Sequence, residues 1–143
     1  MGSQTDHCYE MEVRDHELDA QGIVNNAHYL HYLEHARHKF LNQRGLDFVA
    51  LAQRGVNLVV VRVEVDYLAS LRSGDRFVVT TSVERVSRLR FAFVQRIQRL
   101  PEHAPMLRAR VIGTSLNAAG RPVLAEAVEV LLSGPKPNIL DTE

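Results

Sequence analysis

A chain of 143 residues can bury one hydrophobic core and is too short for two ordinary domains. Its 17 basic and 17 acidic residues cancel to a formal net charge of zero, so no global field would attract nucleic acid or an anionic membrane. Its apolar runs fall short of the roughly 18 residues that a membrane-spanning helix needs. A single cysteine cannot form an internal disulfide, which is typical of a reducing compartment. We therefore expect a cytoplasmic protein with neither nucleic-acid nor membrane partners.

The domain is expected to cover residues 8–133, with flexible termini at 1–7 and 134–143. The C-terminal segment, GPKPNILDTE, contains two prolines, which interrupt helices and central strands. Near the start, YEMEVR (Tyr9–Arg14) alternates apolar and polar residues and predicts a short strand.

A long helix is predicted next. Asn25 or Asn26 is a suitable N-cap, because an asparagine oxygen can accept from the free amides of a first helical turn. The helix is expected to reach about Arg44, where Gly45 can end it. Its inward face is predicted from residues at helical spacing: Leu30, Leu33, Ala36, Arg37, Phe40 and Leu41.

The rest of the chain has a strand period. Alternating segments rich in Val, Ile, Phe and Thr, separated by turn sequences, predict strands at Asn57–Leu68, Asp75–Val86, Leu89–Leu100 and Met106–Asn117. The last segment, Val123–Leu132, suits a strand or a short helix, and its alanines and glutamates favour the helix. The expected class is α+β, with a long helix laid across a curved antiparallel sheet of about five strands. Because such a sheet has open edges, dimerisation by sheet extension is expected.

The loop before the helix carries a candidate for chemistry. Asp19 is followed by Gly22 and then by the helix start at Asn25 and Asn26. Amides of a first helical turn can stabilise an oxyanion, and a nearby carboxylate can act as base or nucleophile, so the segment has the groups that acyl transfer needs. From the residues alone, an Asx-turn or a capping role for Asp19 is the more common outcome.

Three segments carry a family resemblance, which covers about residues 12–123. VRDHELDAQGIVNNAHYLHYLEHARHKFL, VEVDYLASLRSGDRFVV and, more weakly, PMLRARVIGTSLNAAGRPV resemble hotdog-fold thioesterases of the 4-hydroxybenzoyl-CoA thioesterase type. The first segment is most similar to single-hotdog fatty acyl thioesterases, including plant plastid enzymes that hydrolyse acyl-ACP.

The resemblance implies a hotdog fold and an acyl-CoA or acyl-ACP thioesterase of fatty acid metabolism that releases a free acid and a thiol. Fatty acyl groups are the expected substrates, with 3-oxoacyl and aromatic acyl groups as further options. The family's catalytic aspartate falls on Asp19, as nucleophile or as base toward water. The backbone amide that polarises the thioester carbonyl falls on Asn26. The family implies no cofactor, a site between two subunits, and a homodimer or homotetramer.

Further candidates for substrate binding are Gly22, Asn25, Tyr29, Arg37, Arg88 and Arg90. Arg37 suits an acyl-site or loop-organising role as well as an ion pair with Glu34. Arg88 and Arg90 could bind phosphates of CoA or an acidic carrier protein, although exposed arginines at strand ends are common.

For Tyr29, Glu17 and a stripe of histidines, the sequence favours an ordinary structural role. Packing is preferred over lining a channel for Tyr29, and a surface position is preferred over orienting Asp19 for Glu17. The helical stripe His28, His31, His35 and His38 includes an i, i+4 pair but no obvious third ligand, so we predict no metal site.

Two other functions are compatible with such a fold. A hydratase is disfavoured, because the sequence has no DxNPxH-like segment and no suitable Asp and His pair. A non-catalytic module that binds acyl carrier protein or acyl thioesters remains, since fold does not establish activity.

Overall fold

The computed structural model describes residues 7–133, so the two expected flexible termini lie outside the described residues, except for His7. His7 was expected in the terminus but begins the first strand. The elements in chain order are β1 (His7–Glu12), the short 3-10 turn η2 (Asp15–Glu17), α1 (Asn26–Gln43), α2 (Phe48–Gln53), β2 (Asn57–Tyr67), β3 (Arg76–Arg85), β4 (Phe91–Arg99), β5 (Ala104–Leu116) and α3 (Glu126–Leu132).

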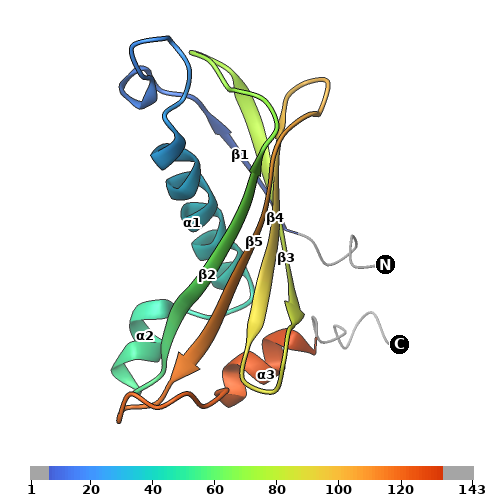
Figure 1. Cartoon of the computed structure of the whole chain (residues 1–143). Helices are drawn as coiled ribbons and strands as arrows, with labels where there is room; N and C mark the ends of the chain where they lie inside the picture. Colours follow the sequence, from blue (N-terminus) through green and yellow to red (C-terminus); the bar gives the residue numbers. More distant parts are fainter. Residues whose placement is uncertain (1–6, 134–143) are drawn as a thin grey trace, which may run out of the picture.

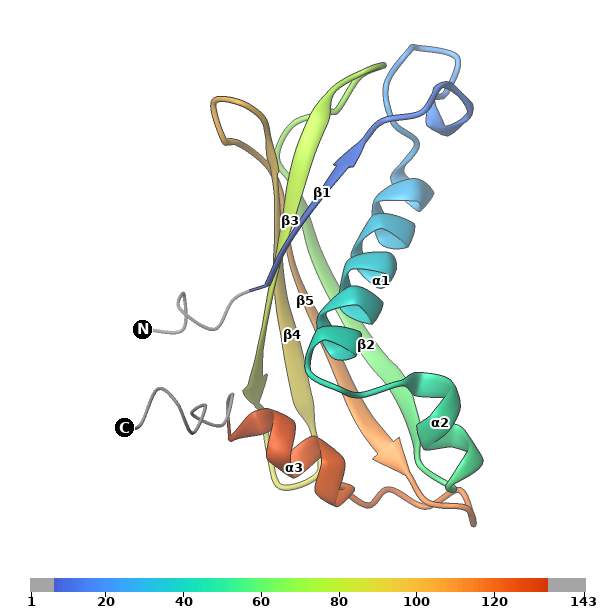
Figure 2. The ribbon, with the colours of Figure 1, turned by 180° about the vertical axis from the view of Figure 1, so that it is seen from behind.

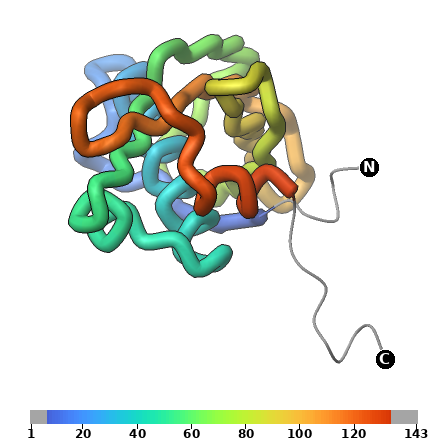
Figure 3. The backbone as a smooth tube through the Cα atoms, turned by 90° about the horizontal axis from the view of Figure 1, so that it is seen from below, coloured from blue at the N-terminus to red at the C-terminus, as the bar shows by residue number. Residues whose placement is uncertain are grey.

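The five strands form one antiparallel sheet in the order β1-β3-β4-β5-β2. Helix α1 lies across one face of this sheet, as the two opposite views in Figures 1 and 2 show. Seen from below in Figure 3, the sheet curves around α1. The predicted α+β class and all five predicted strands are confirmed. No helix within residues 7–133 is long and apolar enough to cross a membrane.

Helix α1 has the predicted ends and most of the predicted inward face, since Leu33, Ala36, Phe40 and Leu41 are buried. The Asn25 side chain accepts a hydrogen bond from the Ala27 amide at 2.9 Å, and Gly45, with φ of +80°, follows the helix. Leu30 was predicted to face the sheet, but 41% of its surface is exposed. Tyr29 and Tyr32 are buried instead, because these residues continue the row of Leu33, Ala36 and Phe40 at the helical period.

The hydrophobic core has two parts along α1. One contains Tyr29, Tyr32 and Leu33 packed on Phe77 and Ile97. The other is built from Phe40 and Leu41 of α1, aromatic residues of β4, and Val128 and Leu131 of α3. The C-terminal segment is therefore a helix, as favoured, although it begins only at Glu126.

Helix α2 was not predicted. Its six residues are too few to show a helical period. The local sign was Asp47 before an apolar run, since its carboxylate accepts hydrogen bonds from the Val49 and Ala50 amides at 2.8 and 3.5 Å.

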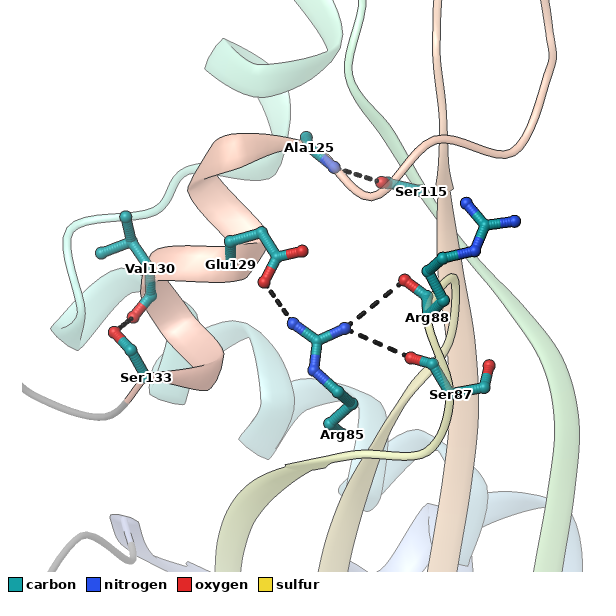
Figure 4. Close-up of polar contacts among 8 residues, drawn as sticks. All are labelled: Arg85, Ser87, Arg88, Ser115, Ala125, Glu129, Val130 and Ser133. Carbon is teal, nitrogen blue, oxygen red and sulfur yellow. Dashed lines mark hydrogen bonds and ion pairs between the residues drawn. The ribbon is translucent and has the colours of Figure 1, made fainter.

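Helix α3 is fastened to the turn between β3 and β4 (Figure 4). The Arg85 guanidinium donates to the carbonyl oxygens of Ser87 and Arg88 at 3.3 and 3.4 Å and pairs with Glu129 of α3. Figure 1 places this turn and the loop that precedes α1 at opposite ends of the molecule.

Position 113 of β5 requires glycine, because the surrounding atoms leave no room for a side chain. A Cβ atom at this position would lie 2.8 Å from the Val59 carbonyl oxygen and 3.2 Å from Cζ of Phe91. We expect Gly113→Ala to lower the free energy of unfolding by about 1–3 kcal/mol, because the backbone of β2 or the ring must shift. Urea denaturation measures this change.

Arg108→Ala, which removes an exposed side chain from the same strand, is the control and should cost less than about 1 kcal/mol. Equal unfolding midpoints for the two variants would show that glycine is not needed at position 113.

Candidate functional site

The loop before α1 is a tight hairpin. Leu18 and Val24 form an isolated β-bridge, and the Asp19 amide donates to the Ile23 carbonyl at 2.8 Å. The Gly22 amide returns to the Asp19 carbonyl at 3.0 Å, and Gly22 has φ of +79°, a conformation that favours glycine. Gly22 thus shapes the loop by its backbone.

The Asp19 carboxylate is oriented by this loop. Its Oδ1 accepts hydrogen bonds from the Gln21 and Ile23 amides at 2.8 and 3.4 Å. This is the Asx-turn geometry that the sequence pattern favoured. Its Oδ2 accepts no hydrogen bond from residues 7–133, and the side chain is exposed. The turn therefore fixes one carboxylate oxygen and leaves the other available.

The start of α1 presents an amide with no protein acceptor. Asn25 caps the helix, because its side chain accepts from the Ala27 amide and its carbonyl accepts from the His28 amide at 2.9 Å. The Asn26 amide has no hydrogen-bond acceptor within the described part of the chain. It lies at the positive end of the helix dipole, so it can stabilise a developing negative charge.

Glu17 holds the loop to the helix. It is only 9% exposed, and its Oε1 accepts from the Tyr32 hydroxyl at 2.6 Å and from the Arg14 amide at 2.8 Å. The expectation of a surface acid was wrong. No hydrogen bond joins Glu17 to Asp19 in the described chain, so Glu17 can position Asp19 only through the backbone of the loop. Burial, and then the bond to Glu17, raise the pKa of Tyr32 well above its ordinary value, so the phenol stays a donor.

A second contact ties the loop to the β2–β3 connection. The Val24 amide donates to the Leu71 carbonyl at 3.0 Å, and the Leu71 amide donates to the Tyr29 hydroxyl at 2.9 Å. Tyr29 is almost fully buried, and burial is the main cause of its raised pKa. Tyr29 therefore packs below the loop, as preferred, and its effect on a substrate would be indirect.

Arg37 lies farther along α1, toward the sheet. Its Nη1 donates to Oε1 of Gln95 at 3.1 Å, and the guanidinium lies 5.9 Å from the centre of the Phe93 ring. No ion pair with Glu34 forms within residues 7–133, so the ion-pair alternative is not observed. Burial lowers the pKa of Arg37, and the nearby charge of Glu34 opposes this shift.

Arg88 and Arg90 lie at the turn between β3 and β4, and Figure 4 shows the Arg88 side chain pointing away from Arg85. This turn and the loop before α1, to which Asp19 belongs, lie at opposite ends of the molecule (Figure 1). One chain therefore brings Asp19, Gly22, Asn25 and Asn26 together and leaves these two arginines far away.

Three histidines of α1 are exposed, namely His31, His35 and His38. In the part of the chain that the structure describes, no group of three or more His, Cys, Asp or Glu side chains is arranged to hold a metal ion.

The Glu17 contact can be tested by stability. Tyr32→Phe should lower the free energy of unfolding by about 1–3 kcal/mol, because the buried carboxylate loses a donor. Tyr9→Phe is the matched control: the Tyr9 hydroxyl makes one long contact of 3.4 Å with His35, so we expect a change within about 0.5 kcal/mol. If the two phenylalanine variants unfold at the same urea concentration, Glu17 does not anchor the loop.

Comparison with known proteins identifies the family. A family model described as the thioesterase-like superfamily matches residues 13–134. The chain is 40% identical over 116 residues to the acyl-acyl carrier protein thioesterase ATL2, chloroplastic, of Arabidopsis thaliana, which covers 81% of this chain and 62% of that protein. A second Arabidopsis relative, ATL3, is matched over the same 62% of its length, so the chain spans less than two thirds of either.

Solved structures show the same fold. The 1,4-dihydroxy-2-naphthoyl-CoA thioesterase Slr0204 from Synechocystis superposes with a TM-score of 0.83 at 19% identity, covering 90% of this chain and 96% of that one. A hypothetical protein of Aquifex aeolicus, AQ1494, gives 0.80 at 29% identity over 87% and 98%. The expected hotdog fold is confirmed, and the chain belongs to the thioesterase-like superfamily.

Proposed function

We propose that this chain hydrolyses acyl thioesters of CoA or acyl carrier protein, with Asp19 and the Asn26 amide as the catalytic groups. The observation that carries the proposal is the pairing, in one short loop, of an oriented carboxylate with a free oxygen and a first-turn amide without a protein acceptor. The Arabidopsis relatives are named acyl-acyl carrier protein thioesterases, which supports the same reaction class and an acyl thioester substrate.

The reaction needs only these groups and water. As a base, Asp19 takes a proton from water while the oxygen of that water adds to the thioester carbon. The carbonyl oxygen becomes negative and accepts a hydrogen bond from the Asn26 amide. The carbon–sulfur bond then breaks, and the thiolate takes the proton from Asp19. As a nucleophile, Asp19 would instead form an anhydride that water hydrolyses. Either route consumes one water and yields a free acid and a thiol.

Other residues support this site indirectly. Gly22 shapes the loop, Asn25 caps α1, and Tyr29 holds Leu71 below the loop. None of these needs to contact the reacting atoms. We therefore assign these three residues to positioning the loop and the helix start, and not to direct contact with the substrate.

We also propose a homodimer formed through β2. This strand lies at the edge of the sheet, and apolar side chains along it are left uncovered in the single chain: Val60, Val63 and Tyr67 are 50%, 44% and 47% exposed. A long exposed apolar edge favours pairing with another strand. Antiparallel pairing of two β2 strands would bring the Arg88 and Arg90 end of one copy toward the Asp19 end of the other (Figure 1).

That arrangement gives the two arginines a role in holding substrate phosphates or an acidic carrier. A homotetramer built from two such dimers, and a cytoplasmic location, stay predictions from the sequence.

Asp19→Asn tests the carboxylate. Because asparagine can still accept in the turn but cannot act as a base or nucleophile, we expect activity to fall on the order of 10²-fold or more. The measurement is thiol release from a panel of acyl-CoAs and acyl-ACPs of different chain length. Asp47→Asn is the matched control, since Asp47 also accepts from two backbone amides. It should keep full activity.

Asn26→Ala is a second control, because a backbone amide survives side-chain replacement. If Asp19→Asn keeps wild-type activity, the carboxylate mechanism is wrong. If no variant and no wild-type protein releases thiol while all bind acyl thioesters, the chain is a binding module.

Val63→Lys tests the dimer. A charged side chain on the uncovered edge should oppose pairing of two β2 strands, so we expect a shift from dimer to monomer in sedimentation experiments at micromolar concentration. The control Arg110→Lys also introduces a lysine, but on β5, and this variant should stay dimeric. A monomeric wild-type protein would contradict the proposal.

A further inference from the structure

A pocket of about 230 Å³ lies between α1, α2 and the β2 side of the sheet. Its walls are largely apolar and include Phe48, Leu58, Phe91, Phe93 and Val111. The absence of a side chain at Gly113 keeps part of this wall open, because a Cβ atom there would lie 3.2 Å from the Phe91 ring. The pocket is large enough for several methylene groups or a small polar head.

One cation faces this apolar space. The half-buried Arg37 lines the pocket and donates one hydrogen bond to the neutral side-chain oxygen of Gln95. Gln95 is itself fully buried, and its amide group donates to the Leu33 carbonyl and to the Thr81 hydroxyl, both at 3.0 Å. These bonds fix the Gln95 oxygen toward Arg37. The guanidinium is therefore held in place from behind, by the sheet.

The remaining N–H groups of Arg37 lack protein acceptors among residues 7–133. An arginine has five such donors in a planar fork that suits a carboxylate. The exposed Glu34 lines the rim of the pocket without forming an ion pair with Arg37. A methyl group placed against Arg37 would remove water from a charge and return no hydrogen bond, which is unfavourable. A carboxylate would satisfy both the charge and the free donors.

The position of Arg37 relative to the proposed site sets a length. Arg37 follows Asn26 by eleven positions on one helix, or about 16 Å at 1.5 Å per residue. Carbon–carbon bonds of about 1.5 Å advance an extended chain by roughly 1.25 Å each, so this distance corresponds to about 13 bonds, or a chain of on the order of 12–14 carbons. The uncovered side chains of Val63 and Tyr67 lie on β2, and the Tyr67 ring is 5.7 Å from the Tyr29 ring near the helix start. Apolar side chains of β2 therefore lie between the pocket lining at residues 58–60 and the start of α1.

We propose that this pocket receives the far end of the acyl chain and that Arg37 selects chains that carry a carboxylate there. The inference rests on the proposed function, because it takes the thioester end of the substrate to lie at Asn26. It assigns the substrate class as monothioesters of dicarboxylic acids of about 12 carbons, in preference to saturated monocarboxylic chains of equal length.

The test compares two CoA thioesters of equal chain length, dodecanoyl-CoA and the monothioester of the C12 dicarboxylic acid. The measured quantity is the ratio of kcat/KM for the diacid to that for the monoacid, in the full chain. Arg37→Met keeps an unbranched apolar stem and removes the guanidinium with its charge, so we expect this ratio to fall about 10-fold. Arg121→Met, which removes an exposed arginine from the β5–α3 connection, is the control and should keep the wild-type ratio.

An unchanged ratio in Arg37→Met, with both proteins active on dodecanoyl-CoA, overturns this inference and leaves the proposed hydrolase intact. If Arg37→Met does not fold, Arg37→Lys replaces it. Lysine keeps a charge but loses the planar fork, so the ratio should still fall, and an unchanged ratio would overturn the inference.

Failure of the proposed hydrolase function can be distinguished from failure of this inference. If the wild-type protein releases thiol from neither substrate, the pocket is tested by calorimetric binding of the same two CoA thioesters, in which only the diacid chain carries a carboxylate at its far end. Tighter binding of the diacid by wild type than by Arg37→Met supports the pocket assignment. Equal binding overturns it.

Discussion

A buried carboxylate holds the loop that carries Asp19. Glu17 accepts from the Tyr32 hydroxyl and from the Arg14 amide, so it joins the segment that follows β1 to the second turn of α1. The hairpin of Asp19 lies directly between these two anchors. A charged oxygen inside a protein is tolerated only with such donors, and their directions fix the backbone that supplies them. The position of Asp19 relative to the start of α1 therefore depends on Glu17.

Helix α1 connects this loop to the rest of the molecule. Its first turn presents the free Asn26 amide, its middle carries Arg37 into an apolar pocket, and its last turns pack Phe40 against β4 and α3. Many of the contacts to the sheet are apolar, and Gln95 adds polar ones, because it bonds both the helix backbone and Arg37. One rigid element thus sets the distance between the proposed thioester position and the proposed end of the acyl chain.

Much of the fold followed from periodicity. The strands and α1 were predicted within a few residues, because long alternating segments and a well-capped helix carry strong local information. Two predictions failed for local reasons. Leu30 was predicted to face the sheet because apolar residues lie on both sides of it around the helix. Helix α2 was not predicted because it is too short to show a period. Glu17 was misjudged because nothing local distinguishes a buried acid from an exposed one. Its partner Tyr32 is fifteen positions away and becomes a neighbour only in the folded chain.

The sequence by itself indicated the five strands and α1 and, through the family resemblance, the proposed catalytic pair. Asp19, Gly22 and the Asn25 cap lie within a few residues, so their geometry is set by short-range hydrogen bonds. Tertiary structure alone decided which groups meet across long separations. The contact of Arg37 with Gln95 spans 58 positions, and the distance of Arg88 and Arg90 from Asp19 follows from strand directions and sheet order. Such relations arise from packing of whole elements, whose order in a sheet is not encoded in any single segment.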